Sequence, residues 1–301
     1  MKILFISREK KTLSIDSVFE GLKQHCDLTV IKFSPEQVKK IRKSFKEINY
    51  NDYDCVVINV PFRRWYNKPR LIKKIPNLAV FDYDTYRNFL KGEEFYKKYS
   101  KFYKKVKGIR LICSGYYNAQ RYKEQGIDAC FISKGYDDKN LRNLGLDRDI
   151  PLGFIGRIND DLYQDRKIYL SDIRDNFGLQ LLRTECKEEY LNTLNRIKIF
   201  VSADIGYNEY MAKNFEAMAC GCALVAKRQG NGEEEALGLI DMQNVVLYDD
   251  LSEAHEKINL LLKDSDLTEK IGSNGQKLVE GSFGLTNKGG ELYRLLQEKF
   301  G

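Results

Sequence analysis

The sequence predicts an α/β protein built from two consecutive doubly wound (Rossmann-like) domains, each with a parallel sheet between layers of helices. Three observations predict this fold. Short apolar runs alternate with amphipathic stretches along the 301 residues, which is the rhythm of strands joined by helical crossovers. The apolar runs are nearly continuous, as expected for strands that are covered on both faces. The rhythm restarts at Pro151, and the length is ordinary for two domains.

The first domain is predicted to span residues 1–148. Six apolar runs predict its strands: Lys2–Ile6, Leu28–Phe33, Cys55–Val60, Leu78–Phe81, Ile109–Cys113 and Ala129–Ile132. Amphipathic segments between them predict helices at 14–24, 35–47, 66–75, 86–106 and 116–125.

The second domain is predicted to span residues 149–285, and its first strand is the run that starts at Pro151. Further strands are predicted at Leu179–Arg183, Ile197–Ser202, Ala223–Ala226 and Val245–Leu247. Helices are predicted at 163–175, 187–195, 211–220, 251–263 and 266–280, with a final helix at 287–300. Gly272 and Gly275 weaken the helix prediction over 266–280, because glycine is a poor helix former.

The composition limits the possible classes of protein. Aromatic residues make up 12% of the chain, too many for a disordered protein, and no apolar run is long enough to span a membrane. Seven cysteines, an odd number, lie mostly in apolar segments, which is typical of reduced thiols in the cytoplasm. The pair Cys220 and Cys222 lacks a second Cys or His pair, so we expect no metal site.

The charge differs between the two halves. Residues 1–150 carry 32 Lys and Arg against 18 Asp and Glu, whereas residues 151–301 carry 18 against 25. Within the basic half, the segment Glu93–Lys107 combines an aromatic stripe with six lysines. One reading is an ordinary amphipathic helix with a solvated lysine face. The other is contact with anionic lipid headgroups or with a polyanionic acceptor.

The densest signal is the segment Asn208–Ala226, in which a strand is followed by a loop, a helix from about Met211 to Gly221, and the next strand. The helix N-terminus then presents free N–H groups to an anion, for which a nucleotide diphosphate is the natural candidate. Lys213 in the first turn opposes the helix dipole, so it is either a phosphate ligand or a surface lysine. Glu216, in an apolar stretch, needs a partner, either a ribose diol or Lys213.

The string NFEAMACGCALVA resembles the FEAMACG-type motif of the group-1 glycosyltransferases, which have the GT-B fold, in which two such domains face a cleft. It is closest to their spore-maturation-like branch. The resemblance implies that Glu216 holds the donor ribose and that Lys213 stands at the family's arginine position. Asn208 stands where retaining members have a second glutamate, so neither a glutamate pair nor its stereochemistry is carried over.

The resemblance covers roughly residues 109–301 and extends to other motifs. Gly156 and Arg157 are similar to the strand–Gly–Arg start of the family's donor domain, where the arginine binds the diphosphate. Arg166 or Lys167 is the candidate second phosphate cation, although the spacer with Asp160, Asp161 and Asp165 leaves the register open. The expected donor side is Gly156, Arg157, Arg166, Lys167, Asn208, Lys213, Asn214, Phe215 and Glu216. The final helix, 286–301, is expected to cross back to the first domain.

The first domain is expected to hold the acceptor and the catalytic base. Asp82 and Asp84 follow a predicted strand, where ligands bind in such sheets, and a carboxylate there suits a general base. Asp84 also suits an N-cap. Acceptor contacts are expected from Ser7 and Arg8 after the first strand and from Arg63, Arg64 and Trp65 after the third, where Trp65 could stack on a sugar or a base.

The sequence therefore predicts transfer of a sugar from a nucleotide-diphosphate sugar, a UDP-sugar first, to a hydroxyl of an envelope polysaccharide or lipid-linked glycan. The protein would be cytoplasmic or peripheral at a membrane and would need no metal or other cofactor. Three alternatives stay open: a glycosyltransferase acting on nucleic acid, a sugar-nucleotide epimerase of similar fold, and a binding module without activity.

Overall fold

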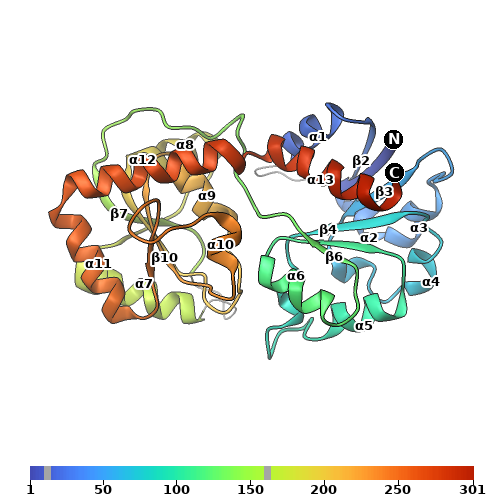
Figure 1. The fold of residues 1–301 in the computed structure, drawn as a ribbon, viewed down its shortest axis with the longest axis horizontal. Coiled ribbons are helices and arrows are strands. Elements are labelled where there is room, and N and C mark those ends of the chain that lie inside the picture. Colours follow the sequence, from blue (N-terminus) through green and yellow to red (C-terminus); the bar gives the residue numbers. More distant parts are fainter. Residues whose placement is uncertain (10–14, 159–163) are drawn as a thin grey trace. The chain divides into compact units, whose positions relative to one another are not determined.

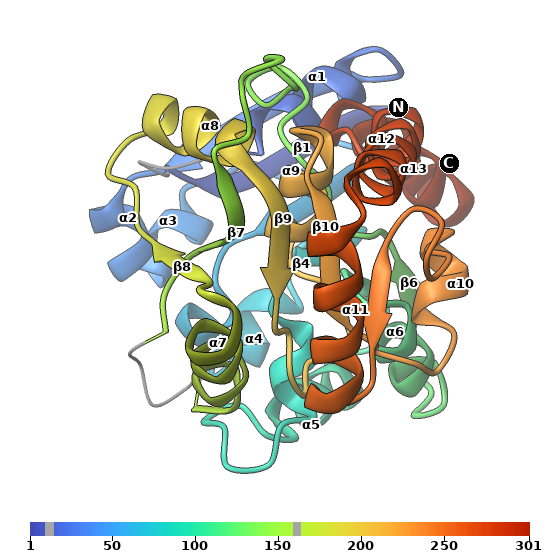
Figure 2. The same ribbon diagram turned by 90° about the vertical axis from the view of Figure 1, so that its left-hand side faces the viewer.

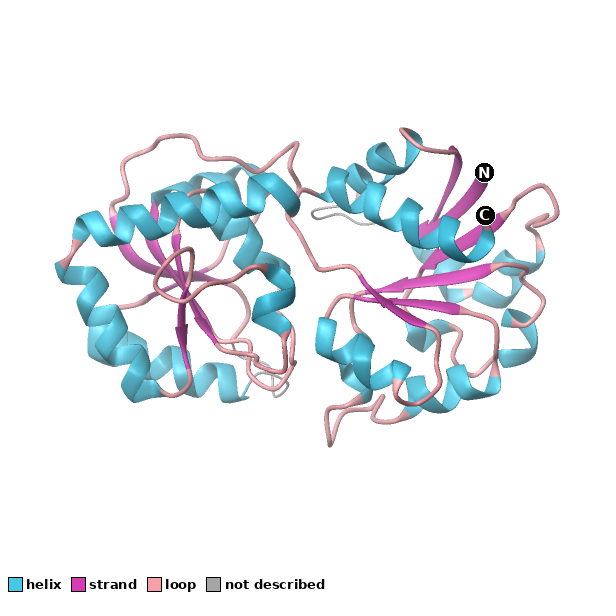
Figure 3. Ribbon diagram, viewed as in Figure 1, coloured by secondary structure: helices cyan, strands magenta, loops and turns pink. Residues whose placement is uncertain are grey.

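The structure is a computed structural model that describes residues 1–9, 15–158 and 164–301. The chain forms two compact units, Met1–Ser133 with Leu285–Gly301 and Lys134–Gly284. In each unit the strands form one parallel sheet with helices on both sides of it (Figure 3). The predicted pair of doubly wound α/β domains is confirmed.

The sheet of the first unit has six parallel strands in the order β2-β1-β3-β4-β5-β6. They are β1 (Lys2–Arg8), β2 (Asp27–Phe33), β3 (Cys55–Asn59), β4 (Leu78–Asp82), β5 (Arg110–Cys113) and β6 (Ala129–Phe131). All six correspond to predicted strands. The chain leaves β1 toward β2 on one side and continues from β3 on the other, so the topological switch point lies between β1 and β3, where Ser7 pairs with Asn59.

Helices cover both faces of this sheet. One face packs against α1 (Asp16–Lys23) and the final helix α13 (Leu285–Phe300), which lie side by side in Figure 1. The other face packs against the remaining helical segments. These are α2 (Pro35–Lys39), α3 (Ile41–Lys46), η1 (Phe62–Arg64), α4 (Pro69–Ile72), η2 (Thr85–Asn88), α5 (Lys98–Lys105) and α6 (Tyr116–Lys123).

Two glycines allow α13 to pack closely on α1. A Cβ on Gly21 would lie 2.0 Å from the carbonyl oxygen of Thr286, and one on Gly289 would lie 2.4 Å from that of Val18. Arg110 on β5 also donates to the carbonyl oxygen of Leu295 at 2.6 Å. The last helix of the chain is therefore an integral part of the first unit.

Three helix predictions in the first unit are wrong in extent. The helix expected over 86–106 is interrupted, because Gly92 and Lys97 adopt positive φ angles of 88° and 58°, so only α5 and the short η2 form. The segment 35–47 is divided at Lys40 into α2 and α3, and 66–75 contains only the single turn α4. The aromatic stripe expected in 93–107 is nevertheless in the core, with Tyr99 and Phe102 2% and 5% exposed.

The second unit begins earlier than residue 149. Residues 134–149 pack on this unit: the N–H of Tyr136 donates to Phe283, and the N–H of Leu144 donates to Asn195 at 2.6 Å. Arg148 donates to the carbonyl oxygen of Cys220 at 2.6 Å. The linking segment is thus held by polar contacts that hydrophobic periodicity does not reveal.

The second sheet has five parallel strands in the order β11-β10-β9-β7-β8, of which β7, β9 and β10 lie side by side in Figure 2. They are β7 (Ile150–Ile155), β8 (Gln180–Leu182), β9 (Ile197–Ser202), β10 (Ala223–Lys227) and β11 (Val246–Tyr248). The chain leaves β7 toward β8 on one side and returns to β9 on the other. The switch point of this unit therefore lies between β7 and β9.

The helices of the second unit are α7 (Gln164–Phe177), α8 (Lys187–Arg196), α9 (Ala212–Ala219), α10 (Glu233–Leu237), α11 (Leu251–Lys263) and α12 (Ser265–Ser282). Only α10 was not predicted. Gly272 and Gly275 do not break α12, and instead allow close packing: a Cβ on them would lie 2.8 and 2.7 Å from the carbonyl oxygens of Gly221 and Asn244. Within the described ranges, no helix combines the length and apolar character needed to cross a membrane.

Helix α9 ends as its sequence predicts. Gly221 has φ +82°, and its N–H donates to the carbonyl oxygen of Met218 while that of Cys222 donates to Ala217. This pair of bonds is a Schellman motif, which requires a left-handed residue and so favours glycine. The next strand, β10, starts at once, which fixes the helix firmly against the sheet.

Candidate functional site

The candidate site lies in the second unit, at the carboxyl edge of the sheet where β7 and β9 meet. Three segments contribute to it: the end of β7 with Gly156, the loop after β9 with Asp204, and the first turns of α9. Ligands bind at the switch point of doubly wound sheets because the crossovers diverge there. Most of the predicted donor-side residues gather at this place.

Lys213 crosses from the first turn of α9 to the end of β7. Its Nζ donates to the carbonyl oxygen of Ile155 at 2.5 Å and lies 5.4 Å from the ring centroid of Phe154. Burial lowers the pKa of Lys213 from 10.5 to about 8, with Glu216 and Asp204 opposing that effect. The nearby carboxylates therefore offset only part of the cost of burying the Lys213 ammonium, and an anion bound at this edge would offset more of it.

Gly156 makes room for this lysine. A Cβ at position 156 would lie 2.2 Å from Lys213 Nζ and 2.9 Å from the ring of Phe154. The glycine expected to contact the diphosphate therefore also has a structural reason to be there, since a side chain would displace the ammonium.

Asp204 organises the rest of the edge. It is 4% exposed and follows β9 by two residues. Its Oδ2 accepts from the N–H of Met211 at 3.0 Å and from Asn214 Nδ2 at 2.8 Å, so it fixes the start of α9. Its Oδ1 accepts from Arg166 Nη2 at 3.1 Å. One carboxylate therefore anchors both the start of α9 and Arg166, the cation that is a candidate for binding the phosphate.

Arg166 is the inward-facing member of the predicted Arg166/Lys167 pair. Its Nε also donates to the carbonyl oxygen of Ala203 at 3.2 Å, and its side chain is 11% exposed. Lys167 is exposed on the outer side of α7. Of the two candidates for the second cation that binds the diphosphate, the structure thus favours Arg166. Asp160 and Asp161, which left that choice open in the sequence, lie outside the described residues.

Glu216 lies one turn after Lys213 on α9 and is 8% exposed. Its Oε2 accepts a hydrogen bond from the hydroxyl of Tyr190 on α8. Burial raises the pKa of Glu216, whereas the Tyr190 hydroxyl and Lys213 lower it. Among the described residues Glu216 makes no ion pair with Lys213, so the reading of these two side chains as a simple salt bridge is wrong.

The N-terminus of α9 retains unused donors. The N–H of Met211 is taken by Asp204, but those of Ala212 and Lys213 have no acceptor among the residues that the structure describes. Free N–H groups at a helix start, together with the helix dipole, favour an anion. With Lys213 and Arg166 nearby, the edge can bind a doubly charged group.

Four other predicted donor-side residues are placed differently. Arg157 and Lys167 are exposed, and Asn208 has a left-handed φ of 54° in the loop before α9. Phe215 is 2% exposed and stacks on Phe283 with ring centroids 4.9 Å apart. Its assignment to the donor contacts is therefore corrected to a core position, because α9 turns that face toward α12.

Sequence reasoning missed a buried ion pair beside this edge. Lys134 Nζ contacts Glu209 Oε1, and the two side chains are 8% and 0% exposed. Lys134 also lies 3.6 Å from the sulfur of Met211. The pair joins the linking segment to the loop that leads into α9. Glu209 directly follows Asn208. A buried carboxylate thus lies one position after the place where retaining glycosyltransferases have their second glutamate.

In the first unit, Ser7, Arg8, Asp82 and Asp84, four of the predicted acceptor-side and catalytic residues, lie at the carboxyl edge of the sheet. Ser7 is buried and Arg8 exposed at the end of β1, and Asn59 Nδ2 donates to Phe81 on the adjoining strand at 2.6 Å. Asp82, the last residue of β4, is 9% exposed and its Oδ1 accepts from the N–H of Asp84 at 2.8 Å. Asp84 is exposed and makes no side-chain cap for η2.

The three residues predicted after β3 separate. Arg63 is exposed, and Arg64 is half-buried. Trp65 is fully buried, with Nε1 donating to the carbonyl oxygen of Val60 at 3.0 Å and its ring 5.2 Å from that of Phe102. The expectation that Trp65 stacks on a ligand is therefore wrong, because η1 turns it into the core.

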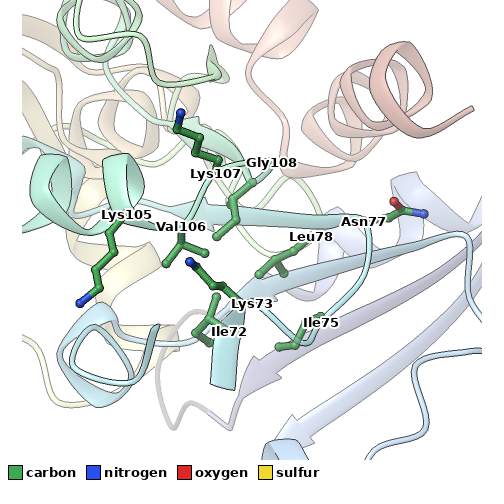
Figure 4. A pocket seen from close by; sticks show the side chains of 10 residues that line it. Ile72, Lys73, Ile75, Asn77, Leu78, Lys105, Val106, Lys107 and Gly108 are labelled. Carbon is green, nitrogen blue, oxygen red and sulfur yellow. The ribbon is translucent and has the colours of Figure 1, made fainter. Parts of the chain in front are cut away.

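Basic residues gather along the helical segments α2 to α5, which cover one face of the first unit's sheet. A hollow of about 570 Å³ is lined by cations from α2, α3 and Lys68, with Glu47 as its one carboxylate. A second hollow, of about 620 Å³, has Lys73, Lys105 and Lys107 around an apolar floor (Figure 4). The single turn α4 lies between Lys68 and Lys73. We call the combined cations the basic surface: Lys39, Lys40, Arg42, Lys43, Lys46, Lys68, Lys73, Lys105 and Lys107.

Comparison with known proteins agrees with this geometry. Residues 177–288, which include α8, α9 and the loop with Asp204, match the family described as "Glycosyl transferase-like". No curated protein matches the chain. The solved structure of Anabaena HepE with UDP-glucose is 14% identical with TM-score 0.67, covering 99% of this chain and 100% of that one.

Two further solved structures are similar over the whole chain. Sucrose-phosphate synthase from Thermosynechococcus elongatus is 14% identical with TM-score 0.67, covering 99% of both chains. The T4 phage BGT in complex with its UDP-glucose substrate is 11% identical with TM-score 0.59, covering 100% of this chain and 99% of that one. These likenesses show that the chain has the fold of GT-B glycosyltransferases.

Proposed function

We propose that this protein is a glycosyltransferase of the group-1 family that uses a nucleotide-diphosphate sugar, a UDP-sugar first. The observation that carries the proposal is the switch-point edge of the second unit, where free N–H groups of α9, Lys213 and Arg166 surround a place for an anion, with Glu216 one turn away. The family match over this region and the UDP-glucose bound by structural neighbours support it. Membership in the spore-maturation-like branch rests on the sequence motif.

The roles follow from the chemistry of each group. Lys213, Arg166 and the helix N-terminus stabilise the diphosphate as it leaves, which is electrostatic catalysis by preorganised charges. Glu216 accepts from the ribose hydroxyls. Asp82 is the first candidate general base toward the acceptor hydroxyl, and Asp84 is the second. Lys213, Arg166 and the N-terminus of α9 would together neutralise the negative charge of the leaving diphosphate.

The acceptor is proposed to be an envelope polysaccharide or lipid-linked glycan, reached by a protein that works in the cytoplasm at a membrane surface. The basic surface supports an anionic partner, since Glu47 is the one carboxylate that lines its two hollows. All seven cysteines are free, which suits a reducing compartment. Nucleic acid is the alternative acceptor, favoured by the same positive charge and by the likeness to a solved β-glucosyltransferase described as a DNA modifying enzyme.

A panel of nucleotides tests the donor site. We expect one of UDP, GDP, CMP, ADP and dTDP to raise the melting temperature selectively, with UDP the first candidate, and Glu216→Ala to abolish the rise. At 100 times the dissociation constant the gain in stability is about 2.7 kcal/mol. A panel without any shift would count against the donor site, and an equal shift in the variant would remove Glu216 from it.

Charge reversal tests the basic surface. We expect the protein to sediment with phosphatidylglycerol vesicles at low salt and Lys39→Glu/Lys46→Glu/Lys73→Glu to bind about 100-fold more weakly, at about 1 kcal/mol per lysine near an anionic surface. The matched control is Lys263→Glu/Lys270→Glu/Lys277→Glu, three exposed lysines of the second unit. Binding to duplex DNA but not to vesicles would select the nucleic-acid alternative.

A further inference from the structure

Tyr190 is the one hydrogen-bond partner of the Glu216 carboxylate among the described residues. Its hydroxyl donates to Oε2, and the two residues are 9% and 8% exposed, so this contact is enclosed within the unit. Oε1 has no hydrogen-bond partner among the same residues, and it keeps some accessible surface. One oxygen of the carboxylate is thus held from behind, and the other stays available to a ligand.

The helix that carries the tyrosine is itself anchored. The next turn of α8 carries Asn195, which is 0% exposed and donates to the carbonyl oxygen of Arg142 at 3.1 Å while accepting from the N–H of Leu144 at 2.6 Å. The helix is therefore fixed to the linking segment. A carboxylate without such a partner turns freely about its last torsion angle, because terminal sp³–sp² torsions have broad minima.

We propose that Tyr190 is a positioning residue of the donor site, whose hydroxyl orients the Glu216 carboxylate so that Oε1 meets the ribose diol of a nucleoside diphosphate. The inference rests on the proposed donor site. It adds that discrimination in favour of the diol depends on a residue of α8 that does not touch the ligand.

The charges around Glu216 give this role a signature in pH. Burial raises the pKa of Glu216 and the nearby Asp137 raises it further, whereas the Tyr190 hydroxyl and Lys213 lower it. Removing the hydroxyl leaves burial less opposed, so the pKa of Glu216 rises. The variant should therefore lose its preference for the diol at a higher pH than the wild type does as the solution is acidified.

The experiment compares UDP with 2′,3′-dideoxy-UDP by isothermal titration calorimetry, from mildly acidic to neutral pH. We expect Tyr190→Phe to bind UDP about tenfold more weakly, the size of one hydrogen bond, and to bind the dideoxy compound as the wild type does. Glu216→Gln should abolish the preference for the diol. Adding Tyr190→Phe to it should cause no further loss, because both residues act through one contact.

Tyr248→Phe is the matched control. Tyr248 is fully buried in the same unit, and its hydroxyl donates to the carbonyl oxygen of Ser202 at 2.8 Å, so the change removes a similar bond away from Glu216. It should leave the preference for UDP intact. An unchanged preference in Tyr190→Phe, or losses that add in the double variant, would overturn the role of Tyr190. A wild type that binds neither compound would instead overturn the donor site itself.

Discussion

Replacing Lys213 with Met is expected to stabilise the empty protein and to remove most of its affinity for nucleoside diphosphates. The ammonium is partly buried at the end of β7, and burial lowers its pKa from 10.5 to about 8. A displacement of that size corresponds to about 3 kcal/mol of unfavourable free energy for the charged form. The bound diphosphate would compensate that cost, so its affinity should fall about 100-fold in the variant, as for loss of one partner from a desolvated charge pair.

The pH dependence has a definite sign. The folded protein holds the Lys213 proton less tightly than the unfolded chain, so the cost is fully present below about pH 8 and disappears between about pH 8 and 10.5. Chemical denaturation should therefore show the stability advantage of Lys213→Met shrinking across that range, while affinity of the wild type for UDP falls. Lys227→Met is the control, since Lys227 Nζ also donates to a backbone carbonyl, that of Asp249, at a strand end. A lower stability of Lys213→Met at neutral pH would contradict this account.

Replacing Asp204 with Ala should have the opposite effect on stability. The change leaves Arg166 without its carboxylate partner. It also leaves Asn214 and the N–H at the start of α9 without their acceptor, in a region that is largely buried. Removing one partner from a buried, charged network costs about 3–5 kcal/mol. Denaturation midpoints should fall accordingly, and Asp204→Asn, which keeps the shape, should fall less.

The molecules of the Asp204→Ala variant that remain folded should also bind nucleotide more weakly, because Arg166 and the N-terminus of α9 lose their common anchor. Asp249→Ala provides the comparison: Asp249 is 60% exposed and pairs with Arg228 at 3.2 Å. A surface pair of that kind contributes at most about 1 kcal/mol. Equal losses in the two variants would mean that Asp204 is an ordinary surface carboxylate in energetic terms.

Hydrophobic rhythm predicted the strands well, because short apolar runs that recur between amphipathic segments are typical of the strands of a doubly wound sheet. It predicted helices less well where glycine or an unusual backbone angle intervenes, as at Gly92 and Lys97. Trp65 shows a related error: position after a strand suggested an exposed aromatic, but a single turn of η1 rotates the ring into the core.

The candidate site was predictable only where one segment contains both the chemistry and the fold signal. Lys213 and Glu216 lie on the motif that forms α9, so the sequence placed them together. Asp204 was within reach, since it follows β9 directly, and a search for polar residues after each strand finds it. Tyr190 was not, because its contact with Glu216 spans 26 positions and depends on how α8 packs.

The close packing of α13 on α1 has a consequence for synthesis on the ribosome. The residues that complete the first unit, 285–301, emerge only after the whole of the second unit, 134–284, has left the exit tunnel. Until then Val18 and Leu22, which are fully buried in the finished protein, lack part of their cover. The second unit, which is continuous in sequence, can therefore acquire its native structure while the first is still waiting for its last helix. A nascent chain stopped before Leu285 would leave this apolar face of α1 exposed to water.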